Sequence, residues 1–216
     1  MLPNDTRSKI ENIVAGSIIE GGADNCTAIR NSLCRSFATS TVVKANFESN
    51  AIIKEEQAHF IENYCNNYNL WLEKAPIETR YLTRGGEAKI YLSEDNRHVI
   101  KLNDAIYYAT WLEFLNSVLL HNLIFNNTSY QLLGFLKVGD ILYAALKQLF
   151  VVANEQAELD DIEKFLEFNG FRNTRRNDYE NKGLGLILED MHDENVIANS
   201  ETLFFIDSVF YTITPQ

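Results

Sequence analysis

The hydrophobic pattern of the first third of the chain is helical. Over residues 8–72, apolar side chains recur at spacings of three and four, which is the period of one helix face. Gly21-Gly22 and the Ser/Thr-rich stretch 36–41 interrupt this pattern, because such residues break helices. We therefore expect roughly three helices before Pro76, which marks a boundary.

The middle of the chain changes to a period of two, which is typical of short, half-buried strands. Three strands are expected at residues 77–83, 87–92 and 98–102, with turns at Arg84-Gly85-Gly86 and Glu94-Asp95-Asn96. They predict an antiparallel meander. A helical pattern follows at 104–124, and two further strands are expected at 130–138 and 141–150.

The last third of the chain mixes one helix with short strands. An amphipathic helix beginning near Leu159 is expected to end at Asn169-Gly170, a common C-terminal signal. We interpret the polar residues 171–183 as a loop. Short apolar runs follow at 184–188, 196–198 and 203–206. The pattern as a whole predicts an α+β protein.

Composition narrows the classes of partner. The chain of 216 residues has 30 Asp and Glu against 19 Lys and Arg, a formal net charge of -11. This charge repels phosphate backbones and anionic membranes, so we expect neither nucleic acid nor a membrane as partner. Three cysteines, none in a Cys-x-x-Cys spacing, favour neither a disulfide framework nor a zinc site. Without a signal-peptide pattern, a cytoplasmic location is expected.

An isolated charge stands out in the apolar helix. Residues 105–136 contain a single charged side chain, Glu113. An ionised carboxylate buried alone is unfavourable, so Glu113 needs a partner. The nearest preceding cation is Lys101, which ends an expected strand between apolar neighbours. We expect the two to pair, although such a pair can also be purely structural.

A second cluster of charge lies near the end of the chain. Four acids and an Asn crowd between apolar runs, and a further acid follows the last of them; these residues are Glu189, Asp190, Asp193, Glu194, Asn195 and Asp207. Like charges packed this closely call for a cation. Oxygen ligands of this kind suit Mg²⁺ or Mn²⁺, which share their coordination with substrate phosphates. The other interpretation is a solvated acidic turn.

The order of these features along the chain is informative. Gly85-Gly86 allows backbone N–H groups to approach an anion, although Gly-Gly is more often only a hairpin turn. A glycine-rich hairpin, a strand lysine, a helix glutamate, an Asp with Asn five residues later and a final Asp together form a set of groups for holding a nucleoside triphosphate. In this hypothesis Lys101 binds phosphates, Glu113 orients it, Asn195 and Asp207 bind Mg²⁺, and Asp190 accepts a hydroxyl proton.

These motifs resemble the protein-kinase fold, and in particular the small kinase domain found in bacterial polyvalent proteins. The resemblance rests on the stretches GGEAKIYL, HVIKLN, WLEFL, LEDMHDENVI and FFIDSVF. It extends over nearly the whole chain, including the N-terminal stretch NSLCRSFATSTVVKANFESN. The resemblance implies an ATP-dependent kinase that acts with Mg²⁺ or Mn²⁺ on a protein Ser, Thr or Tyr hydroxyl.

The resemblance also implies how the chain is organised. It predicts a helical extension (1–75), a five-stranded antiparallel N-lobe with one helix (76–150) and a minimal, truncated C-lobe (151–216). Gly85 and Gly86 then belong to the phosphate-covering loop. The segment Lys147-Gln148-Leu149-Phe150 becomes the hinge between the lobes, whose backbone binds adenine.

Several positions depart from the kinase pattern. Leu188 replaces the usual histidine before the catalytic aspartate, and Ser208-Val209 replaces the Phe-Gly that normally follows the metal-binding aspartate. Only nine residues follow Asp207, so we expect this chain to carry neither an activation segment nor the later helices. We expect the N-terminal helices to take their place by packing against residues 155–210.

Two alternatives stay open at this point. The first is a pseudokinase, a nucleotide-binding or scaffold module that transfers no phosphoryl group. The second takes His192-Asp193 as the metal-binding pair of a phosphohydrolase, a chemistry that needs further histidines nearby. We interpret His121 as a helix histidine that satisfies its hydrogen bonds inside the fold. The phosphoryl acceptor and the oligomeric state are not indicated by the sequence.

Overall fold

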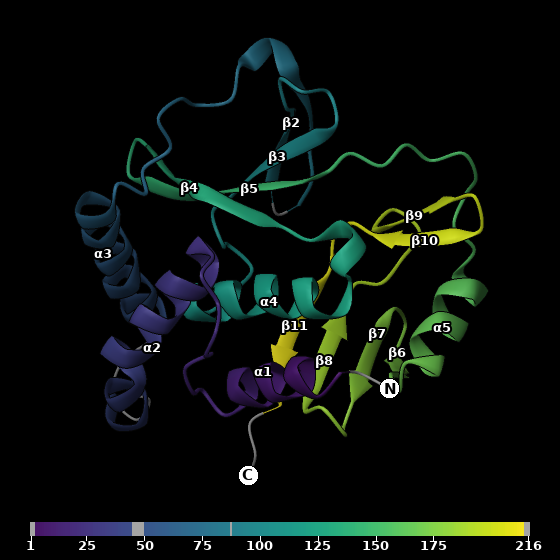
Figure 1. Cartoon of the computed structure of the whole chain (residues 1–216), viewed down its shortest axis with the longest axis horizontal. Coiled ribbons are helices and arrows are strands. Elements are labelled where there is room, and N and C mark those ends of the chain that lie inside the picture. Colours follow the sequence, from purple (N-terminus) through teal and green to yellow (C-terminus); the bar gives the residue numbers. More distant parts are fainter. Residues whose placement is uncertain (1–2, 45–49, 87, 214–216) are drawn as a thin grey trace. The chain divides into compact units, whose positions relative to one another are not determined.

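The computed structural model describes residues 3–44, 50–86 and 88–213. The chain separates into two compact units, which we describe one at a time (Figure 1). Unit 1 consists of Met1–Glu20, Asn116–Ser129 and Val151–Gln216. Unit 2 consists of Gly21–Leu115 and Tyr130–Phe150. Within the described residues, no helix is both long enough and apolar enough to cross a membrane.

Three helices occupy the N-terminal part, as the period of three and four predicts, but the expected break at 36–41 is wrong, because these residues lie inside the second helix. They are α1 (Asn4–Val14), α2 (Asn25–Lys44) and α3 (Asn50–Tyr68). Helix α2 starts after Asp24, whose carboxylate accepts hydrogen bonds from the Thr27 N–H at 2.9 Å and the Thr27 hydroxyl at 2.7 Å. An aspartate in this position satisfies backbone donors that the first helical turn leaves open.

Unit 2 is built around a five-stranded antiparallel sheet in the order β1-β2-β3-β5-β4 (Figure 1). The strands are β1 (Tyr81–Arg84), β2 (Ala88–Leu92), β3 (His98–Asn103), β4 (Gln131–Val138) and β5 (Ile141–Leu149). The five expected strands are therefore all present, although the first begins at Tyr81 instead of residue 77, because Glu78–Arg80 form a 3-10 turn. Glu87, the first residue of the second expected strand, lies outside the described residues. The expected helix begins later than its pattern indicated, as α4 (Trp111–Ile124).

The two faces of this sheet differ in character. Tyr91, Leu102 and Ala145 form an apolar cluster on one face. Because side chains alternate along a strand, Lys101 lies on the opposite face from Leu102. Its cross-strand neighbours on that face are Ile90 and Leu146. The sheet therefore separates an ordinary apolar core from a face that carries a buried lysine.

The outer edge of β4 is covered by the chain segment that follows α3. Leu72 N–H donates to Phe135 O at 2.7 Å, and Phe135 N–H donates to Leu70 O at 2.9 Å. Such a cover removes an open strand edge that could pair with another chain. The close approach requires Gly134, which has φ +154° and faces the Leu70 carbonyl.

We expect Gly134→Ala to lower the free energy of unfolding by about 2–3 kcal/mol, because its Cβ would collide with the Leu70 backbone. Urea titration of the variant measures this loss. Gly183→Ala is the matched control, since its Cβ would meet Asn181 Oδ1 at an ordinary 3.5 Å. Equal stability of the two variants would contradict the proposed close packing.

Unit 1 contains more strands than the sequence pattern indicated. Its strands are β6 (Arg172–Arg175), β7 (Asp178–Asn181), β8 (Leu186–Glu189), β9 (Val196–Asn199), β10 (Thr202–Phe205) and β11 (Val209–Thr212). They form a two-stranded sheet, β10-β9, and a four-stranded sheet, β11-β8-β7-β6. The interpretation of residues 171–183 as a loop is wrong, because β6 and β7 form a hairpin there. Helix α5 (Leu159–Phe168) ends at Asn169-Gly170 as expected.

The first helix belongs to unit 1 through its apolar side. Ile10 and Ile13 of α1 are fully buried. A Cβ added to Gly185 would lie 3.2 Å from Val14 Cγ1, so the end of α1 packs closely on the turn before β8. The predicted packing of N-terminal helices against residues 155–210 is thus observed for α1, whereas α2 and α3 belong to unit 2.

Candidate functional site

Lys101 is a buried cation on the sheet of unit 2. Its side chain is only 5% exposed, and Nζ donates to the Tyr130 hydroxyl at 3.4 Å. The same ammonium lies 5.4 Å from the centre of the Tyr130 ring, within the range of a cation–π interaction. A buried ammonium needs compensating partners. Lys101 is therefore held in place by Tyr130, and its binding of phosphate stays a prediction.

Glu113 helps to start α4. The Thr110 hydroxyl accepts the Glu113 N–H at 3.1 Å, and Glu113 Oε2 accepts the Ala109 N–H at 2.7 Å. This Thr-x-x-Glu arrangement resembles a capping box, which stabilises a helix N-terminus. The contact gives Glu113 a structural role that the sequence analysis did not consider. Its pairing with Lys101 stays a prediction.

Two residues of α3 hold the chain that enters α4. Lys54 Nζ donates to the carbonyl oxygens of Ala105 and Tyr108, and Gln57 Oε1 accepts the Leu112 N–H at 2.9 Å. Burial lowers the pKa of Lys54, while the nearby carboxylates of Asp104 and Glu113 oppose this shift. Both residues escaped the sequence analysis because a Lys and a Gln on a helix are usually solvated. They fix the start of the helix that carries Glu113.

Gly85 and Gly86 lie in the turn between β1 and β2. Gly85 N–H donates to Ala88 O at 3.0 Å, which closes the hairpin. A Cβ at Gly86 would lie 3.4 Å from the Tyr107 hydroxyl. The hairpin is therefore confirmed, and the missing side chain of Gly86 leaves room for the Tyr107 ring. Phosphate binding by this turn stays a prediction.

The predicted hinge residues Lys147, Gln148 and Leu149 form the end of β5. Phe150 N–H donates to Arg97 O at 2.8 Å, so even-numbered residues direct their backbone groups toward β3. Leu149 is odd-numbered, so its N–H and C=O point away from β3, toward the β4 side. Strand β4 begins at Gln131, opposite Lys147, and does not extend as far as Leu149. Among the predicted hinge residues, Leu149 is thus the one whose backbone donor and acceptor point away from β3; adenine binding there stays a prediction.

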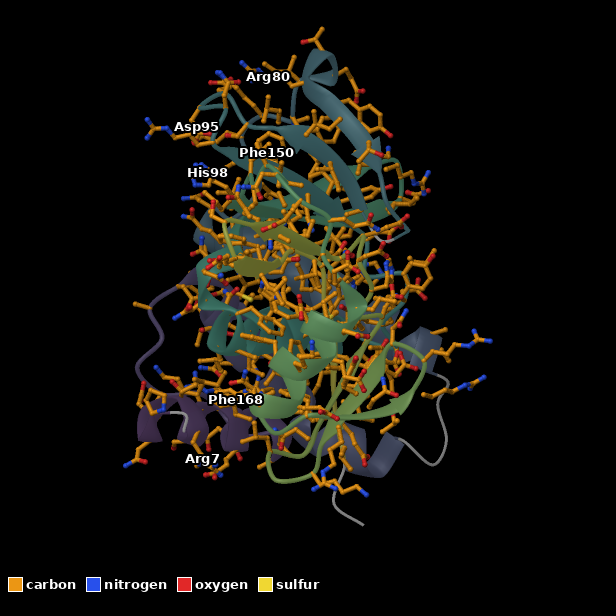
Figure 2. All side chains as sticks on the ribbon, turned by 90° about the vertical axis from the view of Figure 1, so that its right-hand side faces the viewer. Arg7, Arg80, Asp95, His98, Phe150 and Phe168 are labelled. Atoms are coloured by element: carbon orange, nitrogen blue, oxygen red, sulfur yellow. The ribbon has the colours of Figure 1, made fainter. Side chains whose placement is uncertain are left out.

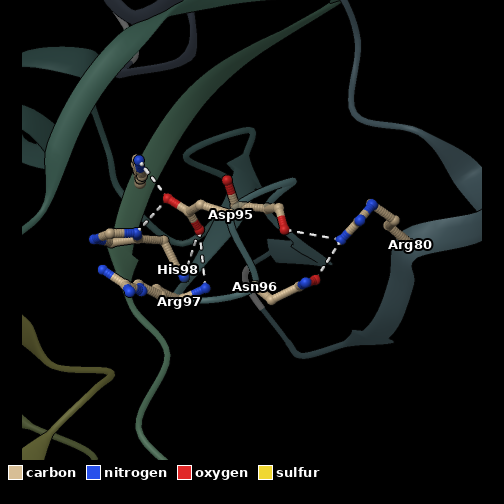
Figure 3. A network of polar contacts seen from close by, with 7 residues as sticks. Arg80, Asp95, Asn96, Arg97 and His98 are labelled. Atoms are coloured by element: carbon tan, nitrogen blue, oxygen red, sulfur yellow. Dashed lines mark hydrogen bonds and ion pairs between the residues drawn. The ribbon is translucent and has the colours of Figure 1, made fainter.

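A polar network fixes the turn beside this hinge (Figure 3). Asp95 accepts the backbone N–H groups of Arg97 and His98 at 2.9 and 3.1 Å. Its Oδ2 is hydrogen-bonded to His98 Nδ1 at 2.7 Å and forms an ion pair with Lys147 Nζ at 3.1 Å. Figure 2 places Asp95, His98 and Phe150 close together in unit 2. The Lys147 side chain is engaged with Asp95, so only its backbone could serve a ligand.

The Asp95 network makes a prediction for acid stability. The Arg97 backbone N–H, helped by Lys147 and His98, holds the pKa of Asp95 well below its usual value, and this outweighs the opposing effect of burial. A lowered pKa stabilises the fold above the unfolded value of about 3.9 and loses this effect as the pH falls below it. We expect the stability difference between wild type and Asp95→Asn to shrink as the pH drops from about 5 to about 2.

Thermal unfolding of both proteins across this pH range measures the difference. Lys147→Met should show a smaller acid-dependent loss than wild type, because one donor to Asp95 is gone. Identical acid profiles for wild type and Asp95→Asn would contradict the role of the network.

In unit 1, the ends of three strands bring the predicted acidic residues together. Asp190 follows β8, Asn195 precedes β9, and Asp207 follows β10 by two residues. Because β9 and β10 pair antiparallel, the start of one lies beside the end of the other (Figure 1). Ile206 N–H donates to Asn195 O at 2.9 Å, and Asp207 N–H donates to the same oxygen at 3.4 Å. Asn195 and Asp207 are therefore neighbours, as the hypothesis requires.

Asn195 also contacts Asp190 directly. Its Nδ2 donates to Asp190 O at 2.8 Å and to Asp190 Oδ2 at 3.2 Å. With the amide nitrogen used in this way, Oδ1 is the atom available as a metal ligand, and Asp207 is the adjacent carboxylate. The described residues contain no group of three or more His, Cys, Asp or Glu side chains able to hold a metal. Two oxygen ligands fit a Mg²⁺ that shares its coordination with phosphates.

The acidic loop, residues 190–195, is strongly negative. Burial raises the pKa of the neighbouring Glu189, and the carboxylates of Asp178 and Asp190 add to this shift. His192 Nε2 lies 3.3 Å from Asp190 Oδ1 within the same loop. The loop therefore has the negative field that a bound cation would relieve.

A network of buried hydrogen bonds around His121 supports the Asp207 segment. The sequence analysis did not connect this histidine to the site. His121, which is 0% exposed, lies 3.0 Å through Nε2 from Thr128 O and 2.6 Å through Nδ1 from Ser208 Oγ. A carbonyl only accepts, so Nε2 carries the proton and Nδ1 accepts from the Ser208 hydroxyl. The Thr128 hydroxyl donates to Phe205 O at 2.6 Å. His121 is thus a satisfied helix histidine, as predicted, and it also anchors the residue after Asp207.

Comparison with known proteins agrees with these features. A family model described as "Serine/Threonine/Tyrosine Kinase found in polyvalent proteins" matches residues 54–214. The match begins within α3 at Lys54 and spans all the candidate site residues of both units. No curated protein and no solved structure matches the chain. Because the family model covers most of the sequence, the chain belongs to the kinase family found in polyvalent proteins.

Proposed function

We propose that the chain transfers the γ-phosphoryl group of ATP, in the presence of Mg²⁺, to a Ser, Thr or Tyr hydroxyl of a protein. The observation that carries this proposal is the position of Asn195, which contacts Asp190 through its side chain and the Asp207 segment through its carbonyl oxygen. These three residues are the set that phosphoryl transfer requires from this part of a kinase. Membership of the kinase family supports the same assignment.

In this proposal, unit 2 supplies the nucleotide contacts. The Lys101 ammonium binds phosphate oxygens, the Gly85-Gly86 turn presents backbone N–H groups to the phosphates, and the backbone of Leu149 binds the adenine edge. Glu113 stabilises the position of Lys101. Each contact positions the substrate or compensates its charge, which is how enzymes of this class lower the barrier.

Unit 1 supplies the chemical groups. Asn195 Oδ1 and the Asp207 carboxylate would hold Mg²⁺, which would compensate the charge of the phosphates. The acceptor hydroxyl gives its proton to the Asp190 carboxylate as its oxygen forms a bond to the γ-phosphorus. The bond from that phosphorus to the bridging oxygen breaks, and ADP leaves with the electron pair. The hydrogen bond from Asn195 Nδ2 keeps Asp190 oriented during this step.

The first test is ATP binding followed by transfer. We expect ATP with Mg²⁺ to raise the melting temperature, and radiolabel from γ-labelled ATP to appear on a protein acceptor or on the chain itself. Stabilisation without transfer to any acceptor would favour the pseudokinase. Absence of both effects would overturn the proposal.

We expect Lys101→Met to weaken ATP binding at least about tenfold, because a charge-assisted contact to phosphate is lost. Isothermal titration with ATP and Mg²⁺ measures the affinity. Lys89→Met is the matched control: it removes the same charge from the neighbouring strand, where Lys89 pairs with Leu102 on the other face of the sheet. Equal losses in both variants would exclude a specific role for Lys101.

A further inference from the structure

Unit 1 contains a pocket of about 890 Å³ that the proposed phosphoryl-transfer site does not use. Its lining comes from the end of α4 and the turn after it, from the segment leading into α5, and from the β9–β10 hairpin. A pocket of this size is in the range that binds ligands or short peptide segments. None of its lining residues is one of the candidate site residues.

Part of the pocket lining is apolar and aromatic, and we call this part the floor. Phe125 and Phe205 stack with ring centres 4.2 Å apart, and the Phe165 ring lies 5.1 Å from that of Phe205. Ile124 and Leu203 complete this floor. Rings that already stack on each other keep their arrangement when a ligand binds. An apolar side chain can therefore bind there with a small entropic cost for ordering the side chains of the pocket.

The rim of the pocket carries charge of one sign. Its charged lining residues are Glu155, Glu158, Asp161 and Glu201, and no Lys, Arg or His is among the described residues that line it. Lys164 pairs with Asp161 at 3.1 Å, but both side chains are mostly exposed, at 72% and 61%. Exposed pairs of this kind contribute little and exchange readily. The rim therefore favours a cationic partner.

We propose that this pocket is a docking site for an extended peptide segment in which Arg or Lys residues flank an apolar side chain. The proposal deepens the proposed function and rests on it, because it names the segment by which a protein substrate is recruited. The apolar side chain occupies the aromatic floor and the cations face the four rim carboxylates. Charge complementarity of this kind raises the rate of association and selects partners.

A direct binding test needs neither ATP nor transfer. The probe is a fluorescein-labelled decapeptide with arginines flanking two leucines, measured by anisotropy against the full chain at low and high salt. A charge-reversed peptide with glutamates and a peptide with serines in place of the leucines are compared with it. We expect the arginine–leucine peptide to bind best and its affinity to fall with salt.

The matched variants lie at the start of one helix, with Glu158 as the residue before α5 and the other three positions in its first two turns. Glu158→Gln/Asp161→Asn is expected to weaken binding about tenfold. Asp160→Asn/Glu163→Gln removes the same charge from α5 at residues outside the pocket lining, and should bind as wild type does. If both double variants weakened peptide binding equally, the net negative charge and not the pocket would explain binding, and the proposal would be overturned. Tight binding of the charge-reversed peptide, or a change in oligomeric state without a change in peptide affinity, would also overturn it.

The two proposals fail in different ways. If the pocket variant lowers transfer to a protein acceptor that contains the basic segment, but not to a short peptide without it, docking is supported. Peptide binding that depends on the pocket without any phosphoryl transfer would overturn the kinase activity alone. Transfer that is insensitive to the pocket variant, with no peptide binding, would overturn docking alone.

Discussion

Replacing Asp190 with Asn is expected to lower the rate of phosphoryl transfer by about 10²–10⁴-fold, the usual contribution of a general base. The ATP-induced rise in melting temperature should stay the same, because Asp190 is proposed to contact the acceptor and not the nucleotide. Steady-state transfer of radiolabel, together with thermal shift, measures both effects on one preparation. An unchanged rate would remove Asp190 from the mechanism.

The backbone makes Asn the right substitution at this position. Asp190 has φ +64°, the left-handed region that Asn and Asp tolerate better than other side chains with a Cβ. Asn also keeps an oxygen that can accept from Asn195 Nδ2. We expect Asp190→Asn to unfold within about 0.5 kcal/mol of wild type. Asp190→Ala should cost about 1–2 kcal/mol in backbone strain, so its activity alone would be ambiguous.

Asp193→Asn is the matched control for Asp190→Asn. Asp193 lies in the same acidic loop, where its carboxylate accepts from Gln156 Nε2 at 3.0 Å. It has no role in the proposed chemistry. We expect this variant to retain most of the transfer rate, and a loss as large as that of Asp190→Asn would indicate that the net charge of the loop matters, not a single base.

The sequence predicted the sheet of unit 2 well because its strands are rich in apolar residues and are separated by turn residues. Buried and less buried positions alternate over the first part of β3 and at both ends of β5, and turn residues separate the strands, so a period of two is visible. The same reasoning failed at β6, whose residues are Arg172, Asn173, Thr174 and Arg175, all exposed. A strand at the edge of a sheet needs no apolar face, and its pairing with β7 leaves no trace in local hydrophobicity.

In the candidate site, too, the sequence predicted some contacts and missed others. The spacing predicted Asp190, Asn195 and Asp207 to be neighbours because a short loop connects Asp190 to Asn195 and the β9–β10 hairpin brings the chain back from Asn195 to Asp207. The contacts of Lys54 and Gln57 with the entrance to α4 join residues about fifty positions apart. Such contacts depend on tertiary packing, which no local pattern encodes.

Ser208 and His121 illustrate a contact that spacing cannot reveal, and they give the largest effect on stability that we expect. The two residues are 87 positions apart, and both are buried, at 7% and 0% exposure. Ser208→Ala leaves Nδ1 of His121 without this donor in a dry environment, which should cost about 1–3 kcal/mol. His121→Ala also opens a cavity and removes the contact with Thr128 O, so we expect about 3–5 kcal/mol.

The double variant separates the contact from the individual side chains. If the hydrogen bond joins the two residues as a unit, the combined loss will be smaller than the sum of the single losses by about 0.5–3 kcal/mol. Urea unfolding of the four proteins measures this coupling, with His59→Ala, an exposed histidine of α3, as the control. Strict additivity would contradict the network. Because Ser208 follows Asp207 directly, Ser208→Ala should also lower transfer more than ATP binding, since the Asp207 segment loses its anchor in unit 1.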